Sequence, residues 1–241
     1  MLNLYIYCSV YICILSLIIT VHLPAFPRHF AVLTLFIGKA LSQILLSTNQ
    51  IPPEIILSGE KNEWSTVALA GTQPLQDGRL PQEWGEKNRQ EQDYVASYIR
   101  RQLLSSGIHP TESGPYPAYA GALSHLKTSF RFTLKDNNRL GSLLELLHPT
   151  PAVCGLPKEE AYRFILDNEG YDRRYYSGFI GWLDPDGKTD LYVNLRCMHI
   201  ENGQLSFYAG GGLLASSELN DEWLETEKKL QTMKRLVSMS L

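Results

Sequence analysis

From residue 54 onward, the chain alternates between short apolar runs and longer segments with helical spacing. Residues 55–57 form an apolar run that ends in a Ser-Gly-Glu turn, and residues 66–71 repeat this pattern, which predicts two buried strands. The polar stretch that follows contains prolines and predicts a loop up to residue 84. Residues 85–106 then carry apolar side chains at i, i+4 and i+8, which predicts a helix that ends at Gly107.

Three further segments have helical spacing. Residues 141–147 precede Pro149, which halts a helix. Residues 158–168 lie between a proline and a glycine, the residue types that favour the two ends of a helix. Residues 217–237 predict a closing helix, and the side chains expected to pack are Trp223, Leu230 and Met233.

Two turn sequences in the last third of the chain predict successive antiparallel hairpins. Asp-Pro-Asp-Gly at 184–187 joins predicted strands at 176–183 and 190–200. Glu-Asn-Gly at 201–203 then joins the second strand to a third at 204–208. The elements together predict an α/β (α+β) protein in which antiparallel strands are flanked by helices.

Residues 1–53 differ from the rest of the chain in composition. They carry only two charged side chains, Arg28 and Lys39, and no acid, whereas the remainder holds 20 basic and 25 acidic residues. Residues 4–21 are almost continuously apolar, which is near the lower length limit for a membrane-spanning helix. Their β-branched and aromatic content equally suits a buried strand. A third interpretation is a misassigned start or a frame error before Glu54.

Composition and charge narrow the classes of function. The 241 residues are 44% hydrophobic and 20% charged, which is typical of a globular protein. A formal net charge of -3 gives no electrostatic reason to bind nucleic acid, so a small molecule or a protein is the expected partner. The four cysteines form no Cys-x-x-Cys pair, which favours a reducing compartment such as the cytoplasm.

Acidic residues on two predicted helices are the first candidates for chemistry. Glu91 lies within the helix at 85–106, and Glu222, Glu225 and Lys229 fall at i, i+3 and i+7 on one face of the last helix. Carboxylates from two helices can bind a hard cation such as Mg²⁺. The alternative is a solvated charged face with an ion pair between Glu225 and Lys229.

A glycine-rich segment and a nearby arginine are the second candidates. Gly210, Gly211 and Gly212 follow a predicted strand, where exposed backbone N–H groups can bind an anion. A crowded turn would explain the glycines equally well. Arg196, on the preceding predicted strand, can hold a carboxylate through two hydrogen bonds, unless it is a surface residue.

Five blocks of sequence, taken in order, resemble the chorismate-binding enzymes. The blocks are Pro53-Glu54-Ile55-Ile56-Leu57, Leu69-Ala70-Gly71-Thr72, His148-Pro149-Thr150-Pro151-Ala152, Gly181-Trp182 with Leu195-Arg196, and Tyr208 to Gly212 with Glu222 to Lys229. The resemblance covers about residues 51–237. Its His-Pro-Thr-Pro-Ala block is similar to that of the isochorismate and salicylate synthases within this superfamily.

The resemblance implies a fold and a reaction. The implied fold has two large antiparallel sheets flanked by helices, and residues 51–241 would form its carboxyl-terminal portion behind a leader at 1–50. In this family water adds to C2 of chorismate while the C4 hydroxyl leaves, and Mg²⁺ holds the ring carboxylate. Isochorismate is the implied product, for menaquinone or siderophore synthesis, and salicylate is the alternative because pyruvate elimination uses much the same pocket.

The resemblance also assigns roles to residues. Glu54 would protonate the departing hydroxyl, and Glu91 and Glu225 would bind Mg²⁺ with Glu222 beside them. His125 matches a family histidine near the substrate, with a purely structural role as the alternative. The implied substrate-binding residues are Gly71, Thr72, Ala152, Val153, Tyr176, Leu195, Arg196, Gly210, Gly211, Gly212 and Lys229.

One part of the family pattern has no counterpart in this chain. The resemblance implies a lysine, well upstream of the Pro-Glu strand, that activates the attacking water. Residues 1–38 contain no lysine, and Lys39 lies only fifteen positions before Glu54. We therefore assign the base to no residue. The expected protein is either a slow isochorismate synthase or a non-catalytic protein that still binds Mg²⁺ and chorismate.

Overall fold

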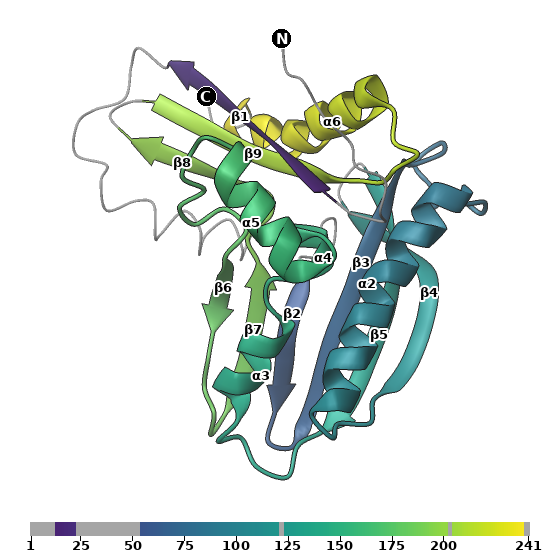
Figure 1. Ribbon diagram of the computed structural model, residues 1–241, viewed down its shortest axis with the longest axis vertical. Helices are drawn as coiled ribbons and strands as arrows, with labels where there is room; N and C mark the ends of the chain where they lie inside the picture. Colours follow the sequence, from purple (N-terminus) through teal and green to yellow (C-terminus); the bar gives the residue numbers. More distant parts are fainter. Residues whose placement is uncertain (1–12, 23–53, 121–122, 202–203, 239–241) are drawn as a thin grey trace.

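The computed structural model describes residues 13–22, 54–120, 123–201 and 204–238 (Figure 1). The strands are β1 (Cys13–His22), β2 (Ile55–Glu60), β3 (Glu63–Pro74), β4 (Thr111–Ala120), β5 (Leu123–Thr133), β6 (Phe179–Trp182), β7 (Lys188–Val193), β8 (Cys197–Glu201) and β9 (Gln204–Leu213). The helices are α2 (Glu86–Ser105), α3 (Leu140–Leu147), α4 (Pro151–Cys154), α5 (Lys158–Asn168) and α6 (Leu219–Ser238).

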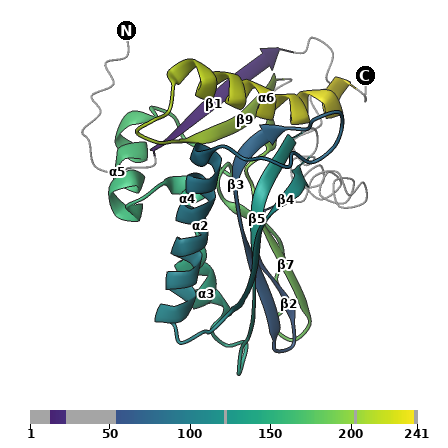
Figure 2. The same cartoon turned by 90° about the vertical axis from the view of Figure 1, so that its right-hand side faces the viewer.

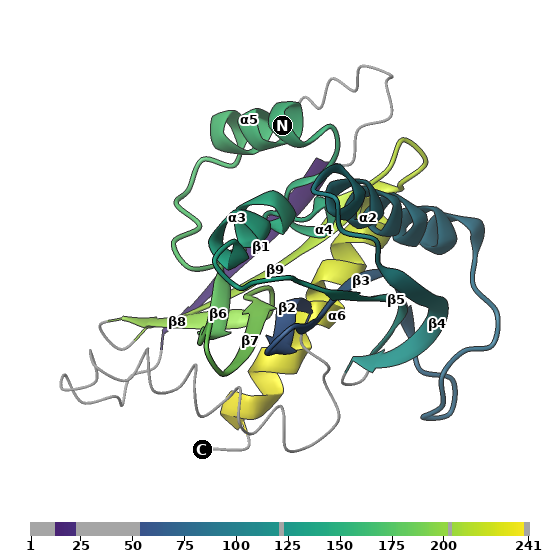
Figure 3. The ribbon, with the colours of Figure 1, turned by 90° about the horizontal axis from the view of Figure 1, so that it is seen from below.

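The strands form two antiparallel sheets. The larger has six strands in the order β4-β5-β3-β2-β7-β6, and the smaller has three in the order β1-β9-β8. Figures 1 and 2 show the smaller sheet and α6 lying across one end of the larger sheet. Helices α2, α3 and α5 lie on the same side of the larger sheet (Figure 3). The predicted class, antiparallel sheets flanked by helices, is confirmed.

The main apolar core lies between the larger sheet and its helices. It joins β2, β3 and β5 to α2 and α3 through a single cluster of buried side chains. The helical spacing predicted for α2 is confirmed, because Val95, Ile99 and Leu103 are all buried in this cluster. Burial of one such side chain contributes about 1.5–3 kcal/mol, so α2 is fixed against the sheet mainly by this face.

Helix α6 packs against β9 with a face that is apolar at one end and polar at the other. Leu230 and Met233 are buried, as predicted, beside residues of β9. Trp223 is 44% exposed, so its predicted packing role is wrong. Glu222 and Thr226, eight and four residues before Leu230, are buried in its place. The polar half of this face therefore points into the molecule.

The two predicted hairpins form, but they lie in different sheets. Strand β6 pairs with β7 in the larger sheet, and β8 pairs with β9 in the smaller one. The single strand predicted at 190–200 is therefore wrong, because the chain leaves β7 after Val193 and enters β8 at Cys197. Arg196 lies at this crossing between the sheets. Gly210–Gly212 are also not a turn, since they continue β9 beyond the predicted end at 208.

The amino-terminal apolar run is described only in part. Residues 13–22 form β1, which pairs with β9 from Cys13 opposite Leu213 to His22 opposite Gln204. Of the interpretations given for this apolar run, the structure therefore has the strand at residues 13–22. Residues 1–12 and 23–53 lie outside the described residues. Within the described part of the chain, no helix is both long and apolar enough to cross a membrane.

Candidate functional site

Most polar residues singled out by the sequence meet at the end of the larger sheet that faces β9 and α6. They come from β3 and β5 of the larger sheet, from the first turns of α2, from the β7–β8 crossing and from the polar face of α6. Figures 1 and 2 show these elements converging. The fold thereby brings site residues as far apart in the sequence as Glu54 and Lys229 into one region. Their spacing along the chain does not show this proximity.

A bulge in β3 begins the site. The register between β3 and β5 shifts between Ala70 and Thr72, and Gly71 has a φ of +69°. A Cβ atom at Gly71 would lie 2.8 Å from the backbone oxygen of Asn88, so both the conformation and the close approach of α2 require glycine. Two side chains of α2 accept hydrogen bonds from this bulge: Asn88 from the Thr72 N–H at 3.2 Å and Gln92 from the Ala70 N–H at 2.9 Å.

His125 connects the bulge to Arg196. Its Nδ1 lies 2.8 Å from the Gly71 carbonyl oxygen, and its Nε2 lies 2.6 Å from a guanidinium nitrogen of Arg196. The carbonyl can only accept and the guanidinium can only donate, so Nδ1 carries the proton and Nε2 accepts. Burial, followed by the charge of Arg196, holds the pKa of His125 well below its usual value. The imidazole is therefore neutral.

Arg196 is half-buried beside His125, and its charge acts on the buried carboxyl of Glu54. Arg196 also donates to the Ala120 carbonyl oxygen at 3.3 Å, and burial lowers its pKa to about 10. Glu54 is 6% exposed, and its carboxylate oxygen accepts a hydrogen bond from the Thr150 hydroxyl at 3.3 Å. Burial raises the pKa of Glu54 to about 7, against the opposing effects of Thr150 and Arg196.

Three carboxylates and two lysines form a second polar group between α2 and α6. Lys87 contacts Glu222, which is 2% exposed, and lies 3.6 Å from Glu91. Lys229 lies 2.8 Å from Glu225. The predicted ion pair between Glu225 and Lys229 is thus present, but it faces the interior of the site and is not part of a solvated surface.

The charges in this group shift one another's pKa values. Burial raises the pKa of Glu91 to about 7, with Lys87 opposing and Glu225 adding to the shift. Burial also acts upward on Glu225, but Lys229, Lys87 and a hydrogen bond from Thr72 outweigh it, so its pKa lies below the ordinary value. Burial acts downward on Lys87, but its carboxylate neighbours outweigh it and its pKa is raised.

The glycines of β9 lie next to this group of charged side chains. Lys229 donates to the Gly210 carbonyl oxygen at 3.2 Å. A Cβ atom at Gly211 would lie 3.6 Å from a carboxylate oxygen of Glu222 and 3.8 Å from the Lys229 ammonium. These glycines lie in a strand beside charged side chains, and the binding of an anion by their N–H groups stays a prediction.

The apolar residues predicted to line the pocket pack against neighbouring side chains or against the main core. Tyr176 is buried and stacks on Tyr208, with ring centroids 5.4 Å apart. Arg173 lies 5.6 Å from the Tyr176 ring and donates to the Val153 carbonyl oxygen at 3.3 Å, which joins the two segments. Three of the predicted lining residues belong to or pack against the main core: Ala152, Val153 and Leu195.

Several site residues carried no separate prediction from the sequence. Asn88 and Gln92 hold the bulge, Lys87 contacts the acids, and Thr150 holds Glu54. A signal was present for Gln92, because it lies three residues before Val95 on the apolar face of α2, where a polar side chain needs a specific partner. Its buried amide indeed bonds the Ala68 carbonyl and the Thr128 hydroxyl.

The fit of this region to a metal ion depends on the two lysines. Among the residues that the structure describes, no group of three or more His, Cys, Asp or Glu side chains is arranged to hold a metal ion. Carboxylate oxygens are nevertheless the donors that Mg²⁺ prefers. The Lys87 ammonium, which lies between Glu91 and Glu222, is a stand-in cation for them. The three carboxylates are thus donors of the type that Mg²⁺ prefers, and in this structure lysine ammonium groups contact them.

Comparisons with known proteins agree with this geometry. A family model described as chorismate binding enzyme matches residues 48–238. Isochorismate synthase DhbC of Bacillus subtilis (strain 168) is 39% identical over 197 residues, which cover 78% of this chain and 49% of DhbC. Isochorismate synthase EntC of Escherichia coli (strain K12) is 34% identical over 190 residues, covering 75% of this chain and 48% of EntC. The chain spans about half the length of these two relatives.

A solved structure extends the likeness to three dimensions. The crystal structure of DhbC from Bacillus anthracis matches with a TM-score of 0.78 and 26% identity, covering 95% of this chain and 67% of that chain. The family match spans the acid, the arginine and both helices of the carboxylate group. Sequence and fold thus point the same way, and the chain belongs to the family of chorismate-binding enzymes.

Proposed function

We propose that this chain carries an isochorismate synthase site in which Glu54 is the general acid. One observation carries the proposal: Glu54 is a buried carboxyl whose pKa is raised to about 7 in spite of the positive charge of the half-buried Arg196. A general acid works best when its pKa is near the working pH, because a large fraction then holds a proton and can release it. Such a group can protonate a departing hydroxyl.

Three hydrogen bonds support the orientation of this acid and of its neighbour. The Thr150 hydroxyl fixes one oxygen of Glu54, which leaves the other oxygen for the substrate. His125 and the Ala120 carbonyl fix Arg196 from behind. A guanidinium has five N–H donors, so Arg196 keeps enough of them to bind a carboxylate of chorismate.

The proposed metal is Mg²⁺, held by Glu91 and Glu225 with Glu222 beside them. Bound there, Mg²⁺ would neutralise and position the substrate's ring carboxylate. Without a metal, two lysine ammonium groups of this chain are the cations next to these acids, and Mg²⁺ would replace one of them. Lys87 and Lys229 already balance the negative charge, which keeps three neighbouring acids together without the metal. Gly211 leaves the space above Glu222 free of a side chain.

The identity of the base limits the proposed activity. A lysine can take a proton from water only as the neutral amine, and the raised pKa of Lys87 keeps it an ammonium. Lys229 is engaged by Glu225 and by the Gly210 carbonyl. We therefore infer that the chain binds chorismate with Mg²⁺ but converts it slowly. A protein that binds without turnover is the second candidate, favoured by the same two lysine contacts.

The test uses the purified chain in two measurements. Calorimetry with chorismate, with and without Mg²⁺, should show binding that requires the metal. Product analysis over a long incubation should show isochorismate accumulating far more slowly than with E. coli EntC assayed alongside.

Three results would revise the proposal. No binding in the presence of Mg²⁺ would reject the proposed site. Turnover comparable to that of EntC would show that another residue of this chain acts as the base. Salicylate as the main product would reassign the reaction to one that continues with loss of pyruvate.

A further inference from the structure

A groove separate from the candidate site lies between α2 and the segment that joins α4 to α5. Its volume is about 620 Å³, within the range of about 300–1,000 Å³ that is usual for small-molecule sites. It shares no lining residue with the acid, the arginine or the carboxylate group. The residues that matter for its chemistry are Tyr94, Tyr98, Arg101, Leu156, Pro157 and Lys158.

The groove is lined by two cations and by no acid. Arg101 is exposed, and within the described residues it has no ion pair, whereas its neighbour Arg100 is bound by Glu112 through two hydrogen bonds of 2.7 and 2.8 Å. Lys158 donates one hydrogen bond to the His148 carbonyl oxygen at 3.1 Å, and its ammonium has three donors. Both cations therefore have donors left for an anion.

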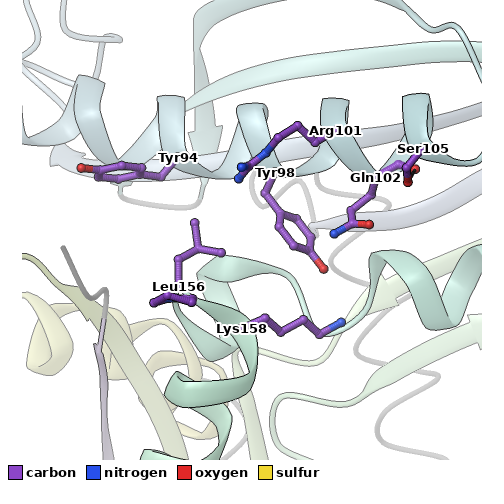
Figure 4. A pocket seen from close by; sticks show the side chains of 8 residues that line it. Tyr94, Tyr98, Arg101, Gln102, Ser105, Leu156 and Lys158 are labelled. Carbon is purple, nitrogen blue, oxygen red and sulfur yellow. Dashed lines mark hydrogen bonds between the residues drawn. The ribbon is translucent and has the colours of Figure 1, made fainter. Parts of the chain in front are cut away.

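The walls of the groove are aromatic and apolar. Tyr98 is 4% exposed, and its hydroxyl donates to the Leu146 carbonyl oxygen at 3.2 Å, which fixes the ring. The Lys158 ammonium lies 6.0 Å from the centre of that ring. Figure 4 shows Tyr98 and Gln102 pointing from α2 toward Lys158, with Leu156 on the opposite wall. Because Tyr98 is almost wholly covered, the apolar surface open to a ligand is that of Tyr94, Leu156 and Pro157.

We propose that this groove binds a small aromatic carboxylate. The carboxylate is attracted to Arg101 and Lys158, and the ring packs against the partly exposed side chains of Tyr94 and Leu156. A free phosphate would meet the two cations but leave the apolar walls uncovered, and a neutral aromatic would leave the cations unmatched. The pairing of both features in one groove selects a ligand with both. This inference does not depend on the proposed activity, because it uses none of the same residues.

Titration of the full chain with salicylate, in the absence of Mg²⁺ and chorismate, tests the proposal. Arg101→Met should weaken salicylate binding by about tenfold or more, because a charge-assisted hydrogen bond contributes about 1.5–3 kcal/mol. Lys158→Met should weaken the same binding event. Arg100→Met is the matched control, since it removes the same charge one residue away on the helix, and binding should change by less than about twofold.

Two results would overturn the groove as a ligand site. One is the absence of salicylate binding at millimolar concentration. The other is binding that Arg101→Met and Lys158→Met leave unchanged, which would place salicylate elsewhere, for example in the chorismate site. Arg101 is exposed, so its substitution should leave the fold intact, and circular dichroism of each variant checks this.

Discussion

Two regions of the candidate site differ in how they accommodate buried ionisable side chains. The acid pocket (Glu54, Thr150, His125 and Arg196) holds one carboxyl and one guanidinium, both strongly desolvated. The carboxylate cluster (Glu91, Glu222 and Glu225 with Lys87 and Lys229) balances three acids with two ammonium groups. In the first region, burial decides the pKa of Glu54. In the second, the ammonium groups hold the pKa of Glu225 below its ordinary value, whereas burial still raises the pKa of Glu91.

This difference explains why one region suits proton transfer and the other suits a cation. A carboxyl that is isolated by burial keeps a proton near neutral pH. A carboxylate that is surrounded by ammonium groups, as Glu225 is, stays ionised and can exchange one cation for another. Glu91 lies between these limits, because burial raises its pKa to about 7 in spite of Lys87. Substitutions in the two regions should therefore have separable effects.

The largest effect is expected in the carboxylate cluster. Glu91→Gln and Glu225→Gln should each abolish Mg²⁺-dependent chorismate binding, because each removes charge from a site for a hard divalent cation. Glu222→Gln should weaken it by about 10- to 100-fold, as expected for a residue beside the metal ligands. Calorimetry at fixed Mg²⁺ measures all three variants. Undiminished Mg²⁺-dependent binding in Glu91→Gln or Glu225→Gln would exclude that residue as a ligand.

The next largest effect is expected on turnover in the acid pocket. Glu54→Gln keeps the shape and the contact with Thr150 but carries no transferable proton, so the slow conversion of chorismate should fall by about 10²- to 10⁴-fold. Mg²⁺-dependent binding should change by only a few-fold, since Glu54 lies outside the carboxylate cluster. Glu60→Gln, an exposed change at the end of the same strand, is the control. If Glu54→Gln retained the wild-type rate, the two regions would not divide their roles as proposed.

A third effect concerns stability against pH. The folded-state pKa of Glu54 is raised to about 7 from an ordinary value of 4.5. The neutral carboxyl therefore favours the folded state fully below about pH 4.5, and this contribution is lost as the pH rises through 7. The loss amounts to about 3 kcal/mol for a shift of this size.

Urea unfolding at pH 5 and pH 8.5, without Mg²⁺, measures this contribution. Glu54→Gln should lose less stability than the wild type between the two pH values. Part of the wild-type slope should remain in the variant, because the pKa of Glu91 is shifted in the same direction. Identical slopes in the two proteins would mean that Glu54 titrates near its ordinary value.

The smallest effect is expected for His125, which acts through Arg196. His125→Phe preserves the bulk of the ring but removes the bonds to Gly71 and Arg196, and chorismate binding should weaken by about tenfold. His125→Gln should recover part of the loss, since its amide can donate to Gly71 and accept from Arg196. Calorimetry compares the two variants. Equal losses in both would argue against a positioning role for this histidine.

Periodicity and capping predicted the helices well. Helix α2 runs from Glu86 to Ser105, against a prediction of 85–106, and α5 matches its predicted range of 158–168. Both segments combine a repeating apolar face with a favourable residue at each end, and these are local signals. The hydrophobic pattern did not single out β4, which is largely exposed, or β5, which buries the polar residues Ser124, His125 and Thr128 among its apolar ones.

The predictions from the sequence were wrong where an apolar pattern continues along the chain but the structure around it changes. The apolar alternation of 190–200 gave no sign that the chain passes from one sheet to another near Arg196. Trp223 was expected to pack because it is large and apolar, but the buried face of α6 at that level is Glu222 and Thr226. A polar site displaces apolar residues from the interior, and the sequence does not reveal this without its partner elements.

The site could be predicted as a set of residues but not as a network. The resemblance supplied Glu54, Glu91, Glu225 and Arg196 one by one. The bond between His125 and Arg196 joins residues 71 positions apart, and the bond between Thr150 and Glu54 spans 96. Such contacts depend on strand register and on the crossing between the sheets. They orient Glu54 and Arg196, and spacing along the chain carries no information about them.

The most direct test of this account is the pKa of Glu54 itself. Side-chain carboxyl ¹³C NMR of the full chain, with Glu54→Gln to assign the signal, follows this carboxyl as the pH is raised from 4 to 9. The account predicts a midpoint near 7, with the carboxyl still largely protonated at pH 6. A midpoint at or below 5 would contradict it, because Glu54 would then be ionised at neutral pH and could not act as the general acid.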